Sequence, residues 1–327
     1  MALRFTRLDG LLVLMTVIWA ANYSVIKAAI REIPEVPFNA VRLLMASAFF
    51  LLALAWTSWR RAKSSSRRPP ASSIWSRSFA LQIVALGIVG HFLYQVLFIS
   101  GLSRTSVANS ALIIGCTPII VAMLSVALGQ ERTTLPRVAG ALLSALGIYF
   151  VVGHGADASG QTLGGDLAMF GAVCCWSAAT VGARPLLARH SPLLVTGGSI
   201  TVGALLYLVY GWRGVQQVTW STVAAPIWIA MIGSAGLALG VAYLIWYTAV
   251  QRLGGTRTSV YSNVVPLAAM LIAWICLGEP IGALKILGAA AIIGGVALTK
   301  AGGNGPGHRS NSGTSEFPAK SQSFAAS

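Results

Sequence analysis

Residues 118–131 read PIIVAMLSVALGQE, and residues 266–279 read PLAAMLIAWICLGE. In each stretch a proline precedes a glutamate by thirteen residues, and an apolar run separates the two. Glycines follow each glutamate after nine and after sixteen residues, at Gly140 and Gly147 in the first case and Gly288 and Gly295 in the second. Several matches at fixed offsets indicate that the chain contains an internal duplication.

A second pair of matches extends the duplication towards the start of each half. Asp9 precedes Trp19 by ten residues, and Asp166 precedes Trp176 by ten. These residues are offset by 157 positions, whereas the proline, glutamate and glycine pairs are offset by 148. A longer basic loop in the first half, residues 58–78, accounts for the difference.

The composition indicates a membrane protein. Hydrophobic residues make up 56% of the 327 residues and charged residues only 9%, whereas a soluble domain carries about 25% charged residues. A helix needs about 20 mostly apolar residues to cross the hydrocarbon core. The predicted spans are 9–30, 37–57, 79–101, 106–128, 136–153, 166–187, 192–212, 225–250, 257–277 and 282–299.

The ten predicted spans divide equally between the two halves. We predict one five-helix repeat over residues 8–153, a second over 164–300, and a disordered cytoplasmic tail over 301–327. Because five is odd, the second half enters the membrane upside down relative to the first. The predicted fold is therefore an all-α integral membrane protein with ten transmembrane helices in two inverted repeats, an architecture found in secondary transporters.

The basic residues predict the orientation. The chain has a net charge of +15, and 17 of its Lys and Arg residues fall on the side of the two termini against five on the other side. Arg42 is left near the start of the second predicted span. Cytoplasmic loops carry the excess of Lys and Arg, so both termini are expected in the cytoplasm. The same rule accounts for the positive net charge, so no nucleic-acid partner is expected. The expected partners are a small-molecule substrate and the lipid bilayer, and the chain is expected to be a monomer or a homodimer.

The duplicated motifs resemble those of a known family. The segments Trp19–Tyr23 (WAANY) and Leu277–Pro280 (LGEP), together with the shared spacing from proline to glutamate to glycine, are similar to the drug/metabolite transporter superfamily, in the branch with paired EamA domains. The first half departs from the pattern at Gly129–Glu131, where a glutamine separates the Gly-Glu pair. The resemblance implies alternating-access export of amino acids and other small metabolites across the bacterial inner membrane.

Polar and aromatic residues at mid-membrane depth are the candidates for a substrate cavity. On the first and third predicted helices they recur at i, i+3 and i+4, which places them on one face. Interhelical hydrogen bonds and aromatic packing are the alternative explanation. The candidates are Trp19, Asn22, Tyr23, His91, Tyr94, Gln95, Trp176, Thr180, Tyr243, Trp246 and Asn263.

His91 is the only ionisable residue that the predicted spans place near the bilayer centre. It could couple transport to protons or remain neutral and hydrogen-bond the substrate. With so few buried charges, we expect a neutral or zwitterionic substrate such as an amino acid. The aromatic residues would hold its apolar part, while Asn22, His91, Gln95 and Asn263 would orient its polar ends.

Two prolines are candidate hinges. Pro118 and Pro266 fall in the middle of the fourth and ninth predicted spans, where a proline interrupts the helix. Matched interruptions in two inverted halves point to the binding region, although prolines also simply bend membrane helices. Glu131 and Glu279, in the loops that follow, could act as gates or could tie the loops to nearby basic residues.

Motifs for catalysis are missing from the sequence. There is no Walker loop and no His-Glu-x-x-His motif, and Cys116, Cys174, Cys175 and Cys276 show no metal-ligand spacing. We therefore expect no catalytic residue, no cofactor and no metal. A membrane-embedded enzyme acting on lipids, a sensor or assembly factor, and an exporter of nucleosides or cationic drugs are the alternative functions.

Overall fold

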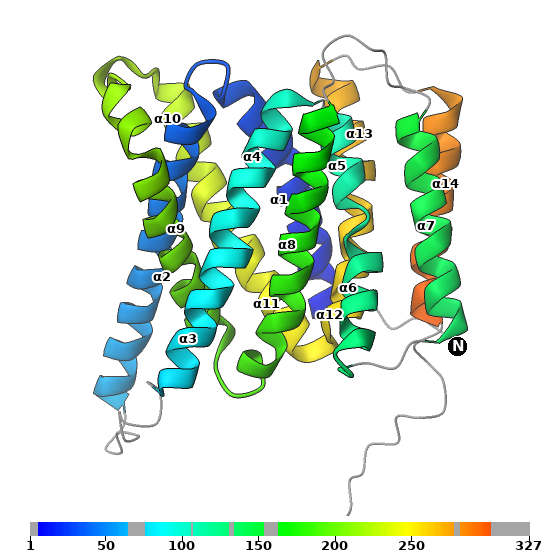
Figure 1. The fold of residues 1–327 in the computed structure, drawn as a ribbon, viewed down its shortest axis with the longest axis horizontal. Helices are drawn as coiled ribbons and strands as arrows, with labels where there is room; N and C mark the ends of the chain where they lie inside the picture. Colours follow the sequence, from blue (N-terminus) through cyan, green and yellow to red (C-terminus); the bar gives the residue numbers. More distant parts are fainter. Residues whose placement is uncertain are drawn as a thin grey trace, which may run out of the picture.

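The computed structural model describes residues 6–64, 76–105, 107–130, 134–153, 163–277 and 282–301. Within these ranges every regular element is a helix (Figure 1). The loop residues Glu131 and Glu279, and the predicted tail beyond Ala301, lie outside the described residues.

The order of elements in the first half recurs in the second. Each half has two long helices, then a rod with a π-helical turn in its middle, then an interrupted helix and a last helix. The first half contains α1 (Arg7–Ala29), α2 (Glu35–Ser64), α3 (Arg77–Leu86), η2 (Gly87–Leu93), α4 (Tyr94–Arg104), α5 (Val107–Ile114), α6 (Thr117–Ala127) and α7 (Leu135–Gly153). The second contains α8 (Leu163–Leu187), α9 (Pro192–Gln217), η3 (Trp220–Thr222), α10 (Ala225–Gly233), η4 (Ser234–Val241), α11 (Ala242–Leu253), α12 (Gly255–Ser259), η5 (Val260–Asn263), α13 (Val264–Leu277) and α14 (Ala283–Ala301).

Within the described ranges, six helical rods are long and apolar enough to cross a membrane. They are Arg7–Ala29, Glu35–Arg60, Arg77–Arg104, Leu163–Leu187, Pro192–Gln217 and Ala225–Leu253. Each coincides with one of the predicted spans. The other four predicted spans contain shorter or interrupted apolar helices, so the count of ten stays a prediction.

The two halves pack against each other throughout the bundle. Helix α1 contacts α13, η4 and α11 of the second half, and α8 contacts η2, α4, α5 and α6 of the first. Helix α2 packs along α9 at one edge, and α7 packs along α14 at the opposite edge (Figure 1). The centre is therefore built from α1, α8 and the two rods that contain π-helical turns.

The two prolines lie in the middle of the predicted spans, each beside an interruption of the regular α-helix. Pro118 lies at the start of α6, just after the break at Gly115 and Cys116, and Pro266 lies in the first turn of α13, just after η5. The segment from Gly255 to Leu277 stays helical throughout, and the 3-10 turn η5 interrupts its α-helical geometry just before Pro266. Two turn residues separate α5 from α6 before Pro118, where a proline in the first turn of α6 removes no intrahelical hydrogen bond. The regular α-helix is therefore interrupted next to each proline, as the sequence predicts, although only the first segment contains a turn between two separate helices.

The π-helical turns were not predicted, and glycines lie at one of their closest contacts. A Cβ atom on Gly203 of α9 would lie 2.4 Å from the Cβ of His91 in η2, and one on Gly87 of η2 would lie 2.6 Å from the Cβ of Val202. Only glycine leaves space for these two backbones to approach so closely. The wider turn of η2 thus presses directly against α9.

The edge pair of α7 and α14 provides a test of the packing. A Cβ on Gly295 would lie 2.2 Å from Ser144 Oγ and 2.4 Å from the Gly140 oxygen. We expect Gly295→Val to force the helices apart and to lower the free energy of unfolding by about 1–3 kcal/mol, measured by thermal unfolding in detergent. Gly294→Ala is the control, because its nearest contact would be Leu143 Cδ2 at 3.7 Å. Equal unfolding temperatures for both variants would contradict this packing.

Candidate substrate cavity

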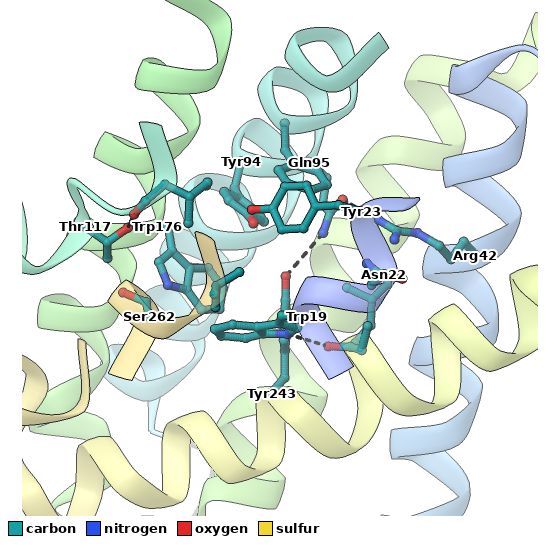
Figure 2. Close-up of a pocket in the computed structure, with 15 residues that line it drawn as sticks. Trp19, Asn22, Tyr23, Arg42, Tyr94, Gln95, Thr117, Trp176, Tyr243 and Ser262 are labelled. Carbon is teal, nitrogen blue, oxygen red and sulfur yellow. Dashed lines mark hydrogen bonds between the residues drawn. The ribbon is translucent and has the colours of Figure 1, made fainter. Parts of the chain in front are cut away.

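A small cavity lies at the centre of the bundle, where both halves contribute side chains. Its volume is about 40 Å³, which is enough for only one or a few water molecules. A metabolite can therefore bind only if the walls move. The cavity is lined by Trp19, Asn22, Tyr23, Arg42, Tyr94, Gln95, Phe98, Ile114, Thr117, Trp176, Ala238, Leu239, Tyr243, Ser262 and Val265 (Figure 2).

One wall of the cavity is a cluster of aromatic rings from different helices. The Trp19 ring of α1 meets the Trp176 ring of α8 edge-on, with centroids 5.7 Å apart. Tyr243 of α11 lies 5.0 Å from Trp176, and Tyr94 of α4 lies 5.1 Å from it. These distances fall in the range where aromatic pairs attract each other. The cluster therefore joins four rods of the bundle around Trp176.

The opposite wall is polar and centres on Arg42 of α2, whose side chain is fully buried. Arg42 donates from Nε to Asn39 Oδ1 at 3.0 Å, from Nη1 to Ser234 Oγ at 3.0 Å and from Nη2 to Gln95 Oε1 at 2.8 Å. Figure 2 shows Arg42 extending from its helix towards Asn22 and Gln95. Its hydrogen bonds connect α2 to α4 and to η4.

Further hydrogen bonds continue from this arginine to the aromatic wall. The Ser234 hydroxyl donates to Asn22 Oδ1 at 2.5 Å, and Gln95 Nε2 donates to the Tyr243 hydroxyl at 3.2 Å. The Trp19 indole donates to the carbonyl of Ala238, inside the π-helical η4, at 3.1 Å. Since carbonyls in irregular helix need partners when water is excluded, the indole both lines the cavity and satisfies the backbone.

Seven of the predicted site residues line the cavity: Trp19, Asn22, Tyr23, Tyr94, Gln95, Trp176 and Tyr243. The other four lie behind its walls. Trp246 packs 5.4 Å from both Trp19 and Trp176 and donates its indole proton to Thr180 Oγ1 at 3.3 Å.

His91 and Asn263 also lie behind the lining residues. The His91 ring lies 5.6 Å from the Tyr243 ring, and its Nε2 is 3.0 Å from Ser199 Oγ of α9. Asn263 follows the lining residue Ser262, and its buried Oδ1 has no hydrogen-bond partner within the described part of the chain. These residues support the cavity wall in this conformation.

The cavity lining includes Arg42, which was not among the predicted site residues. Arg42 was placed only near the start of the second predicted helix, which left His91 as the one central ionisable residue. The buried Arg42 side chain nevertheless reaches the cavity, whereas His91 lies behind its walls. Glu35, Asn39 and Arg42 follow one another at helical spacing in the first part of α2, before a mostly apolar stretch. Such a polar stripe inside a membrane span is a signal for a functional face.

The starts of α1 and α8 are tied to other helices in similar ways. Asp9 of α1 accepts a hydrogen bond from the Tyr261 hydroxyl, and Thr16 donates to the Tyr261 carbonyl at 3.4 Å. Asp166 of α8 accepts from Thr105 Oγ1, just after α4, at 2.8 Å. Each half therefore joins the start of its first helix to a neighbouring rod.

An apolar helical bundle with a central cavity lined by both halves defines a polytopic membrane transporter. The chain belongs to the EamA-like transporter family, which it matches over residues 7–153 and 163–300. The resemblance predicted from the duplicated motifs is confirmed.

Several curated proteins are similar to the chain over most of its length. It is 31% identical over 229 residues to the uncharacterized transporter YyaM of Bacillus subtilis, which covers 69% of this chain and 74% of that protein. An uncharacterized transporter of Archaeoglobus fulgidus is 28% identical over 89% of this chain and 96% of its own length. A probable terminal-alkyne amino-acid exporter of Streptantibioticus cattleyicolor is 26% identical, over 88% of this chain and 91% of its own length. A crystal structure shares the fold, with a TM-score of 0.68 and 21% identity over 89% of this chain and 96% of that one.

The hydroxyl of Ser234 provides a test of the polar wall. We expect Ser234→Ala to lower the free energy of unfolding by about 1–3 kcal/mol, because it removes the acceptor of the buried Arg42 Nη1 and the donor to the half-buried Asn22 Oδ1. Thermal unfolding in detergent measures the change. Ser24→Ala is the matched control, since the buried Ser24 Oγ has no hydrogen-bond partner among the described residues. A loss as large for Ser24→Ala as for Ser234→Ala would contradict the network.

Proposed function

We propose that this transporter exports small neutral or zwitterionic metabolites, above all amino acids with an apolar or aromatic side chain, by alternating access. The observation that carries the proposal is the cavity itself, which sets an aromatic wall around Trp176 opposite a polar wall around Arg42. An amino acid has both kinds of surface. Aromatic faces attract an ammonium group and pack against an apolar side chain.

We propose ten transmembrane helices in two inverted repeats, residues 8–153 and 164–300, in the bacterial inner membrane with both termini in the cytoplasm. The recurring order of elements supports this arrangement, since the third rod of each half has a π-helical turn and the fourth is interrupted. The excess of Lys and Arg on the terminus side supports the orientation.

The amino-acid class draws support from one relative as well as from the cavity. The protein of Streptantibioticus cattleyicolor that resembles this chain is named a probable terminal-alkyne amino-acid exporter. An amino acid that carries an alkyne would combine a zwitterionic end with an apolar end. We extend only this general chemistry to the present chain.

Alternating access requires the cavity to open at one end at a time. We propose that the contact of Asp9 with Tyr261 and the contact of Asp166 with Thr105 close opposite ends, because inverted halves place the starts of α1 and α8 on opposite faces. The turn before Pro118 and the 3-10 turn η5 before Pro266 would be the hinges, since irregular backbone can absorb a bend more easily than a regular α-helix. Trp246, Thr180, His91 and Asn263 would position the cavity wall during these movements.

Counterflow in proteoliposomes tests this function. We expect unlabelled phenylalanine inside the vesicles to stimulate uptake of labelled phenylalanine, and Trp176→Ala to reduce that uptake by about tenfold or more, because the substrate loses the central ring of the aromatic wall. Trp212→Ala is the matched control, since Trp212 is 51% exposed on α9, away from the cavity lining.

Two outcomes would contradict the proposal. Full uptake by Trp176→Ala would show that the central cavity is not the transport path. Absence of exchange for every labelled amino acid, by a protein that remains folded in the vesicles, would reject the substrate class.

A further inference from the structure

Arg42 carries a buried charge whose hydrogen-bond partners are all neutral. Its side chain is 0% exposed, and among the described residues it donates hydrogen bonds only to Asn39, Ser234 and Gln95. Within the described ranges no carboxylate forms an ion pair with it. Glu35 on the same helix lies seven residues earlier, about 10.5 Å along the axis. A buried charge without a counter-ion is costly in a membrane bundle and is a functional-site hypothesis by default.

The guanidinium has more donors than its recorded partners use. A guanidinium has five N–H groups, and the three hydrogen bonds use one on each nitrogen. One further N–H on each terminal nitrogen has no partner among the described residues, and Arg42 is part of the cavity lining. A guanidinium is the side chain best suited to bind a carboxylate through two of its N–H groups.

Asn22 adds a donor beside the arginine. Its Oδ1 accepts the Ser234 proton, so its amide nitrogen is the end that remains for a ligand. Asn22 lines the cavity between Arg42 and Trp19 (Figure 2). An anionic group at Arg42 would therefore meet donors from α1 and α2 together.

We propose that Arg42 is the receptor for a carboxylate group on the transported molecule, so that a carboxylate is an obligatory feature of the substrate. The inference rests on the proposed function, because it uses the same cavity. It redefines the substrate class by its carboxylate, so that amino acids stay inside the class and simple organic anions join them. Organic acids with an apolar or aromatic body are accepted whether or not they carry an amine. Amines without a carboxylate are rejected, because the guanidinium repels them and no anion would balance its charge.

A purely structural role for Arg42 is the competing explanation, and Gln95→Glu separates the two. The substitution keeps the shape of the side chain and places a carboxylate at the position 2.8 Å from Arg42 Nη2. If Arg42 has only a structural role, the new carboxylate would strengthen its interactions, and the transporter would keep its selectivity among substrates. A carboxylate receptor would instead be occupied by the internal carboxylate and would lose affinity for acids.

The experiment is competition against labelled phenylalanine counterflow, with the full chain in proteoliposomes. The probes are phenylalanine, phenylpropionate, phenylalaninamide and phenethylamine. We expect the two acids to compete and the two compounds without a carboxylate not to. In Gln95→Glu, competition by the acids should weaken about 10- to 100-fold, the usual strength of charge-assisted hydrogen bonds. Lys27→Gln is the matched control and should keep the ranking, because Lys27 donates to carbonyls at the end of α4, outside the cavity lining.

Binding is also measured without transport, by the shift in unfolding temperature that each probe causes in detergent. Stabilisation by the two acids alone, lost in Gln95→Glu and in Arg42→Gln, supports the inference even if phenylalanine does not exchange, in which case only the proposed function fails. Equal effects of acids and amines, or acid selectivity that survives Gln95→Glu, would overturn the inference while leaving transport intact. No stabilisation and no competition by either acid would overturn it as well.

Discussion

The hydrogen bonds of the Arg42 guanidinium are the interaction around which the central cavity is arranged. A charge inside a membrane bundle must find its partners within the protein, because lipid offers none. Asn39, Gln95 and Ser234 supply them and thereby fix α2 against α4 and η4. Ser234 in turn donates a hydrogen bond to Asn22, and Gln95 donates one to Tyr243. The positions of α1 and α11 therefore depend on the same buried charge.

The π-helical turns and the interrupted helices serve this arrangement. The π-helical turn of η4 carries Ser234 and the Ala238 carbonyl, which meet Arg42 and Trp19. The π-helical turn of η2 packs so closely on α9 that Gly87 and Gly203 cannot carry a side chain without movement. Irregular backbone is tolerated at membrane depth only where protein or a cavity surrounds it. In this bundle η4 contributes Ala238 and Leu239 to the cavity lining and η5 contributes Ser262, whereas η2 lies behind the lining.

Much of this architecture could be predicted from the sequence, because the relevant signals are local. Apolar run length located the six long rods, and the spacing of Trp19, Asn22 and Tyr23 placed three residues on the face that lines the cavity. The family followed from the repeated proline, glutamate and glycine positions, and the match confirms it.

Other features depend on tertiary context and could not be predicted in that way. Its position in the sequence predicts that Arg42 lies near one end of its span, whereas in the structure its long side chain reaches the cavity. Whether Pro118 bends a helix or begins one depends on whether the preceding Gly115 and Cys116 remain helical. A π-helical turn arises from packing against neighbours such as α9, and hydrophobic periodicity does not report it.

The central claim is that one cavity opens alternately to the two sides of the membrane. Single cysteines at Phe98 and at Ser262, two lining positions on different rods, test this most directly in a variant that lacks Cys116, Cys174, Cys175 and Cys276. A membrane-impermeant maleimide would be applied to right-side-out and to inside-out vesicles, with and without phenylalanine. The account predicts labelling of both positions from both sides, and slower labelling when phenylalanine is present. Labelling from one side only, under every condition, would contradict it.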